Sequence, residues 1–293
     1  MTRDELAPGL TVDWLNAWLA ALGVAILLPG VRLSWTRTPV PAACFARSDG
    51  SPPLAEALAA ALPSVGALDT LAIARSRPPA QEFSRTVRLD VYAERAALAR
   101  ASRDWSLSST VTDLVAPPPA DGLPDAPFNP PVPQGRTLWE RAVSCRRAIV
   151  DPAADITATL AGDGRRRVNN GLGFDVRRLA AGVQNTDKRV DPVVELLAFC
   201  ALGLFPMRGN GAKVPRARGW TGPPGRPGSF RWCAWSPALD RWAIDALLDV
   251  LPDARGHPDF ADRLGILTWY HTVPYRSKSE NDMTRAYGAE CEP

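Results

Sequence analysis

Basic residues form the most distinctive chemical pattern of this chain. Between residues 165 and 231 there are thirteen lysines and arginines against four acids, so this stretch carries a net charge of +9 while the remaining chain carries −6. No acidic residue occurs between Glu195 and Asp240. Arginine binds phosphate through paired hydrogen bonds, and clustered positive charge attracts polyanions. The charge distribution therefore predicts a nucleic acid as the partner.

Two glycine-rich segments hold most of these charges. The first is GDGRRRVNNGLGF (162–174), and the second is RGNGAKVPRARGWTGPPGRPG (208–228). Neither segment has the periodicity of a helix or strand, so we expect mobile cationic loops that contact phosphate backbones. A solvated charged surface is the alternative interpretation.

The predicted contact residues come from these two loops and from other basic positions in the second half of the chain. Asn169 and Asn170 would add amide contacts to phosphates or base edges. The nucleic-acid-binding residues that we predict are Arg165, Arg166, Arg167, Asn169, Asn170, Arg177, Arg178, Lys188, Arg189, Arg208, Lys213, Arg216, Arg218, Arg276 and Lys278.

Aromatic residues are interleaved with the arginines near the second loop, and two interpretations of them remain open. They stack on unpaired bases, or they belong to a tryptophan-rich strand that packs into the core. The residues concerned are Trp220, Phe230, Trp232 and Trp235.

Catalytic motifs are missing from the sequence. It contains no phosphate-binding P-loop, no GxGxxG after a strand, no GxSxG and no HExxH. The two histidines and the five widely spaced cysteines exclude most sites built from several such ligands. Asp253, Asp259 and Asp262 lie close to His257 in the sequence, which leaves a metal-dependent nuclease as an alternative. We interpret Asp245 and Asp249 as the solvated side of a helix.

Periodicity and turn residues predict an α+β fold. We expect a mixed helix and strand part over 1–115, a proline-rich linker or loop over 116–134, and a mainly helical part with basic loops over 135–293. The predicted helices are 12–23, 51–62, 94–105, 137–150, 191–205 and one beginning at Ser236–Pro237. The apolar face of this last helix is formed by Leu239, Trp242, Ala243, Ala246, Leu247 and Val250. The predicted strands are 31–35, 40–46, 85–93, 107–115 and 263–273.

One uncharged stretch, residues 14–31, approaches the length of a membrane span. Asn16, Gly23 and Pro29 interrupt it, and the residues before it are acidic rather than basic. We therefore expect a buried core helix and no membrane partner. The odd number of cysteines, without the spacing of a disulfide framework, favours a cytoplasmic location.

Five segments together resemble a known family. They are TVDWLNAWLAALGVAILLPGVRLSW (11–35), NNGLGFDVRRL (169–179), VDPVVELLAFCALGLFPMRG (190–209), FRWCAWSPALDRWAIDALL (230–248) and YRSKSENDMTRAYG (275–288). This set resembles subunits of type I CRISPR interference complexes (Cascade), most of all the large-subunit class of subtype G, formerly called U.

The resemblance implies a non-catalytic subunit without a cofactor. Such a subunit contacts the 5′ end of the guide RNA and the target DNA beside the protospacer, where it recognises a short motif, helps to open the duplex and helps to recruit the nuclease. Its partners would be guide RNA, target DNA and other subunits of the complex. Two alternatives remain: the metal-dependent nuclease, and a scaffold whose basic loops bind an acidic protein.

Overall fold

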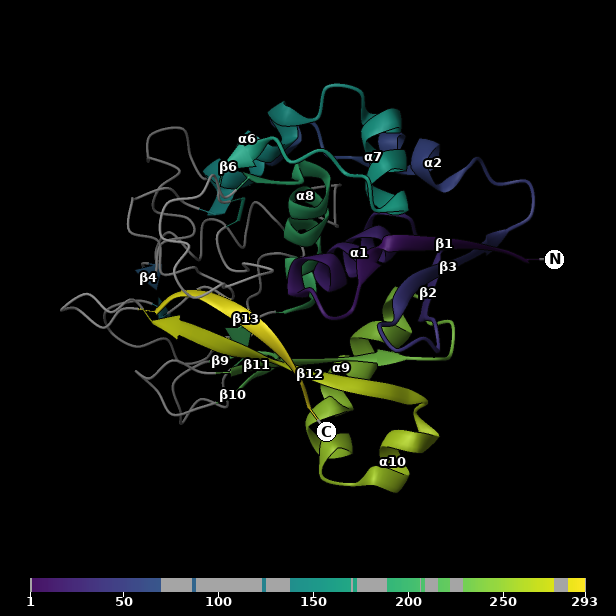
Figure 1. The fold of residues 1–293 in the computed structure, drawn as a ribbon, viewed down its shortest axis with the longest axis vertical. Coiled ribbons are helices and arrows are strands. Elements are labelled where there is room, and N and C mark those ends of the chain that lie inside the picture. Colours follow the sequence, from purple (N-terminus) through teal and green to yellow (C-terminus); the bar gives the residue numbers. More distant parts are fainter. Residues whose placement is uncertain are drawn as a thin grey trace.

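The computed structural model describes residues 2–69, 86–87, 123–124, 138–169, 171–172, 189–205, 207–208, 216–221, 229–276 and 284–292. Helices and strands alternate along them, which confirms the predicted α+β class (Figure 1). Of the predicted linker 116–134, only β5 (Leu123–Pro124) is described, and it pairs with β4 (Thr86–Val87). The rest of that linker, and the predicted elements over 88–115, lie outside the described residues.

The N-terminal sheet has the order β1-β3-β2 and is antiparallel throughout. The predicted strands 31–35 and 40–46 are confirmed as β2 (Arg32–Trp35) and β3 (Ala42–Ser48), which pair with Leu33 opposite Phe45. The sequence analysis missed β1 (Thr2–Thr11). The first residues of β1 are polar and exposed, which an edge strand tolerates. The sequence of β1 therefore lacks the alternation of apolar and polar residues that indicates a half-buried strand.

Two buried helices form the centre of the molecule. The first is α1 (Leu15–Leu27), and the second is α8 (Pro192–Ala201), which begins after the N-cap Asp191 as predicted. Helix α1 continues past Gly23, where we expected it to end. A Cβ at Gly23 would lie 2.0 Å from the carbonyl oxygen of Leu197, so this glycine lets the two backbones touch. In the described part of the chain, no helix is long and apolar enough to cross a bilayer.

The second sheet has the order β10-β11-β12-β13 and is also antiparallel. Its strands are β10 (Trp220–Thr221), β11 (Ser229–Trp235), β12 (Ile266–Arg276) and β13 (Thr284–Glu292). The whole sheet comes from the part of the chain that we expected to be mainly helical. Strand β12 corresponds to a predicted strand, and β11 corresponds to the tryptophan-rich strand that was one of the two interpretations of the aromatic residues.

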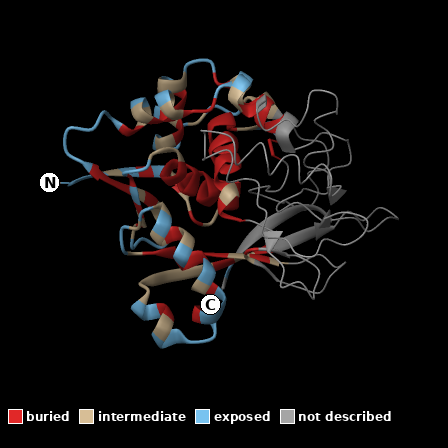
Figure 2. Ribbon diagram, turned by 180° about the vertical axis from the view of Figure 1, so that it is seen from behind, coloured by how far each residue is buried: buried red, intermediate tan, exposed pale blue. Residues whose placement is uncertain are grey.

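Buried residues from the first and last parts of the chain form one core. Figure 2 shows where the buried residues lie along the ribbon. Phe230, Trp232 and Trp235 are fully buried, so the tryptophan-rich segment is a core strand. Trp18 packs against Phe230 and Trp232. The indole N–H groups donate to distant backbone carbonyls: Trp18 to Cys233 at 2.9 Å, Trp232 to Val12 at 2.7 Å and Trp235 to Leu33 at 3.0 Å.

Four further helices lie on the other side of the α1–α8 layer from β11 (Figure 1). They are α2 (Leu54–Ala61), α3 (Val65–Asp69), α6 (Leu138–Ala148) and α7 (Pro152–Ala161). Helices α2 and α6 match predicted elements, whereas α7 was not predicted. The short pairs are β6 (Val168–Asn169) with β7 (Arg189–Val190) and β8 (Met207–Arg208) with β9 (Arg216–Ala217), and a 3-10 turn covers Leu202–Leu204.

Helix α9 (Arg241–Arg255) differs from its prediction in both start and orientation. Its N-cap is Asp240, because the preceding Leu239 pairs with Leu33 of β2 through two backbone hydrogen bonds of 2.8 and 2.9 Å and stays extended. The buried face is Ile244, Leu247, Leu248 and Leu251, and Trp242 is 64% exposed. The predicted face was therefore partly wrong: Leu247 is buried as expected, whereas Trp242 and Ala246 are exposed. Helix α10 (Pro258–Arg263) follows.

Candidate nucleic-acid interface

The three consecutive arginines lie on a well-anchored turn between α7 and β6. Helix α7 ends at Gly162, whose positive φ of 97° reverses the chain, and residues 163–169 (the arginine segment) lead into β6. Within the segment, the N–H of Arg167 donates to Val190 at 3.0 Å. In the described part of the predicted loop, the Gly162 cap and this hydrogen bond connect the chain to α7 and β7.

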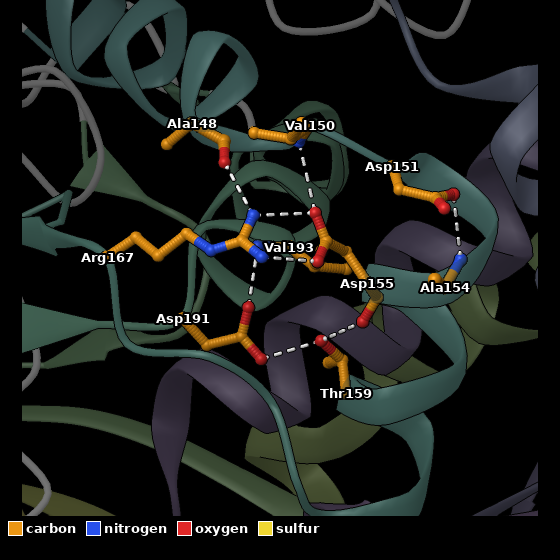
Figure 3. A network of polar contacts seen from close by, with 9 residues as sticks. All are labelled: Ala148, Val150, Asp151, Ala154, Asp155, Thr159, Arg167, Asp191 and Val193. Carbon is orange, nitrogen blue, oxygen red and sulfur yellow. Dashed lines mark hydrogen bonds and ion pairs between the residues drawn. The ribbon is translucent and has the colours of Figure 1, made fainter.

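Arg167 points into the protein (Figure 3). Its two terminal nitrogens each lie 2.8 Å from one oxygen of Asp155, and Nη1 also donates to the carbonyl of Ala148 at 3.0 Å. Burial opposes ionisation of Asp155, but hydrogen bonds from Arg167 and from the N–H of Val150 outweigh it and lower its pKa. Arg167 therefore serves as an anchor whose charge is balanced inside the fold.

Asp191 supports the same segment from the start of α8. Its Oδ1 caps the helix by accepting from the N–H of Val193 at 2.9 Å, and its Oδ2 lies 2.6 Å from the hydroxyl of Thr159 (Figure 3). A Cβ at Gly164 would lie 1.8 Å from that Oδ2, so the segment's backbone rests directly on the carboxylate. Burial raises the pKa of Asp191 despite these hydrogen bonds.

A third acid, Glu195, lies one turn further along α8 and is almost completely buried. Its Oε1 accepts from Nδ2 of Asn16 at 2.6 Å, and its Oε2 accepts from the N–H of Leu172 at 2.6 Å. Burial raises the pKa of Glu195 to about 7, although the hydrogen bonds from Leu172 and Asn16 favour the ionised form. The sequence analysis did not single out Glu195, and its only signal was an acid within a run of apolar residues.

Among the described residues, the exposed positive charges near the arginine segment come from that segment, from β7 and from the end of α6. Arg165 and Arg166 are exposed on the arginine segment, and Arg189 is exposed on β7, where it pairs with Asn169. The sequence analysis missed Arg147, which is exposed on the last turn of α6, next to the carbonyl that Arg167 binds. The structure thus brings one corner of the predicted interface together.

Arg218 is engaged inside the fold. Its side chain is 6% exposed and contacts Asp245, Asp249 at 2.8 Å and the carbonyl of Leu204 at 2.9 Å. The two aspartates, which we interpreted as a solvated helix surface, are its counterions. They fasten the turn between β9 and β10 to α9, so the charge of Arg218 is neutralised within the protein.

The remaining predicted contacts are only partly placed. Arg208 of β8 pairs with Arg216 of β9, and Arg276 ends β12. The rest lie outside the described residues: Asn170, Arg177, Arg178, Lys188, Lys213 and Lys278.

The acids considered for a nuclease do not gather into a metal site. Asp253, Asp259, Asp262 and His257 are all exposed on α9 and α10 or the turn between them. In the part of the chain that the structure describes, no group of three or more His, Cys, Asp or Glu side chains could hold a metal ion. None of the five cysteines, all of which are described, forms a disulfide.

Comparison with known proteins adds no relative. No protein-family model, curated protein or solved structure matches this chain.

Proposed function

We propose that this protein is a non-catalytic subunit that binds the phosphate backbone of a nucleic acid through Arg165 and Arg166. The observation that supports this function is that three consecutive arginines differ in their surroundings. Arg167 is tied to Asp155 inside the fold, while Arg165 and Arg166 remain exposed. A charge presented by an anchored backbone loses less conformational freedom on binding than one on an unattached loop.

The surroundings favour anion binding at this corner. Asp155, Asp191 and Glu195 are buried and bonded to protein groups, so their charges are turned away from the surface. Asp163 is an exposed acid at the start of the segment. Replacing it by asparagine should therefore tighten polyanion binding.

The resemblance to Cascade subunits supports a more specific version of the proposal. In it, the arginine segment contacts guide RNA or target DNA within a complex that contains other protein subunits. Phosphate contacts of this kind position a duplex without reading its sequence. Recognition of a short motif would then require base contacts from other residues.

The test compares two double variants with the same change in charge. Arg165→Ala/Arg166→Ala removes both proposed contacts, and Arg32→Ala/Arg37→Ala removes two exposed arginines on and after β2, away from the segment (Figure 1). Fluorescence anisotropy with labelled duplex DNA over a range of salt measures affinity. The first variant should bind more weakly, with a salt slope lower by about two units, since each phosphate contact contributes about one. Equal affinity and slope in both variants would contradict the proposal.

The same preparations distinguish the alternatives. Incubation with labelled DNA and RNA plus Mg²⁺ or Mn²⁺ should leave the substrates intact. Cleavage that disappears in Asp259→Ala would favour the nuclease. Binding to an acidic protein surface without binding to any nucleic acid would favour the scaffold.

A further inference from the structure

The peptide group between Gly171 and Leu172, which follows the arginine segment, forms hydrogen bonds with a basic and an acidic side chain. The carbonyl of Gly171 accepts from Nη1 of Arg141 at 3.0 Å, and the N–H of Leu172, which belongs to the same peptide group, donates to Glu195 at 2.6 Å. Arg141 comes from α6 and Glu195 from α8. This peptide group therefore fastens the chain that follows the arginines to two helices of the core.

The close approach depends on glycine. Gly171 has a φ of +40°, and a Cβ there would lie 2.4 Å from Oε2 of Glu195. No side chain therefore separates the carboxyl group from the backbone. The Gly171–Leu172 peptide is therefore in direct contact with the carboxyl group, and detaching it would remove one of the groups that bury Glu195.

The polar neighbours of Glu195 can serve either protonation state. Among the described residues these are Asn16 on α1, Arg141 and Cys145 on α6, and Asp191 on α8. The ionised form uses the donors of Asn16 and Leu172. Oδ1 of Asn16 is buried without a hydrogen-bond partner. Rotating that amide by half a turn would present this oxygen to the O–H of a protonated Glu195.

We propose that Glu195 is a proton-linked latch: when protonated it holds the Gly171–Leu172 peptide, which follows the arginine segment, against the core, and when ionised it releases that peptide. Ionisation favours the open arrangement because a buried carboxylate charge is costly in free energy. Burial raises the pKa of Glu195 to about 7, whereas a hydrated glutamate has its ordinary value of 4.5. The closed arrangement binds the proton more tightly than an open one, so a rise in pH favours opening.

Hydrogen exchange at the amide of Leu172 tests the latch in the full-length protein. After correction for the intrinsic exchange rate, its protection should be constant below about pH 4.5, should fall up to about tenfold per pH unit between 4.5 and 7, and should level off above 7. Glu195→Gln cannot ionise and should keep its protection constant. Amides of β11 are the internal control and should not change in either protein. Wild-type protection at Leu172 that is independent of pH, or an equal slope in the variant, would overturn the proposal.

A second measurement covers the case in which Glu195→Gln does not fold. The carboxyl ¹³C shift of Glu195 in the wild-type protein should titrate with a midpoint near 7. A midpoint near the ordinary value of 4.5 would overturn the latch without any variant.

The consequence for binding rests on the proposed function, and its test separates the two ideas. Affinity for labelled duplex DNA at constant salt should fall between about pH 5 and 7 more steeply in the wild type than in Glu195→Gln. If Leu172 exchange follows pH but neither protein binds nucleic acid, the latch is supported and the proposed function is contradicted. If both proteins bind with the same pH profile, the proposed control of binding is overturned.

Discussion

Arg167 and Asp155 form a two-point ion pair, with both nitrogen–oxygen distances at 2.8 Å, directly behind the backbone that exposes Arg165 and Arg166. The paired geometry fixes the direction of the guanidinium as well as its position. Arg167 thus anchors the arginine segment, while its neighbours Arg165 and Arg166 are exposed.

We predict that Arg167→Ala lowers the free energy of unfolding by about 2–3 kcal/mol, because it leaves the largely buried carboxylate of Asp155 without its partner. Arg167→Lys keeps the charge but loses the paired geometry, so its loss should be intermediate. Urea denaturation at pH 7 measures both variants. Arg165→Ala, which removes an exposed neighbour, should change stability by less than about 0.5 kcal/mol. Equal effects of Arg165→Ala and Arg167→Ala would contradict the anchoring role.

The raised pKa of Glu195 predicts how stability depends on pH. The folded value, about 7, lies above the ordinary 4.5, so the folded protein binds this proton more tightly than the unfolded chain does. The resulting stabilisation is fully present below pH 4.5 and is lost as pH rises through 7, for a total of about 3 kcal/mol. Urea denaturation between pH 5 and 8 should show this decline in the wild type and not in Glu195→Gln. A decline of the same size in both would assign it to other groups.

Arg218→Ala should destabilise the protein by about 2–3 kcal/mol, because Asp245 and Asp249 lose their buried counterion and Leu204 loses a hydrogen bond. Its salt slope for duplex DNA, measured under conditions where the variant is folded, should equal that of the wild type. If the variant is as stable as the wild type and its salt slope is lower by about one unit, Arg218 contacts a phosphate of the nucleic acid.

Gly23→Ala should lower stability by about 3 kcal/mol or more, since the added methyl group would overlap the carbonyl of Leu197 and push α1 away from α8. Gly30→Ala is the matched control, because a Cβ at Gly30 would meet nothing within 4 Å and the φ of this residue is not positive. Thermal unfolding of the two variants measures the difference. Similar melting temperatures would mean that α1 and α8 adjust easily at their crossing.

Elements whose signals are local could be predicted from the sequence, and those that depend on distant partners could not. Asp191 followed by Pro192 marked the start of α8 because capping involves adjacent residues, and the alternation over 31–35 marked β2. Strand β1 was not predicted, because an edge strand tolerates polar residues and its sequence lacks the pattern of a buried strand. The start of α9 was misplaced because Leu239 pairs with Leu33, a residue far away in the chain.

The sequence by itself determined that positive charge concentrates in the second half and that this half contains apolar helices and a tryptophan-rich segment. It could not determine which arginines face outward. That choice depends on carboxylates supplied by other elements: Asp155 of α7 turns Arg167 inward, and Asp245 and Asp249 of α9 bury Arg218. The same holds for Glu195, whose pKa rises because α1, α6 and the Gly171–Leu172 peptide together exclude water from it. Charge is a property of residues, but its exposure and its ionisation are properties of packing, so only the tertiary structure decided them.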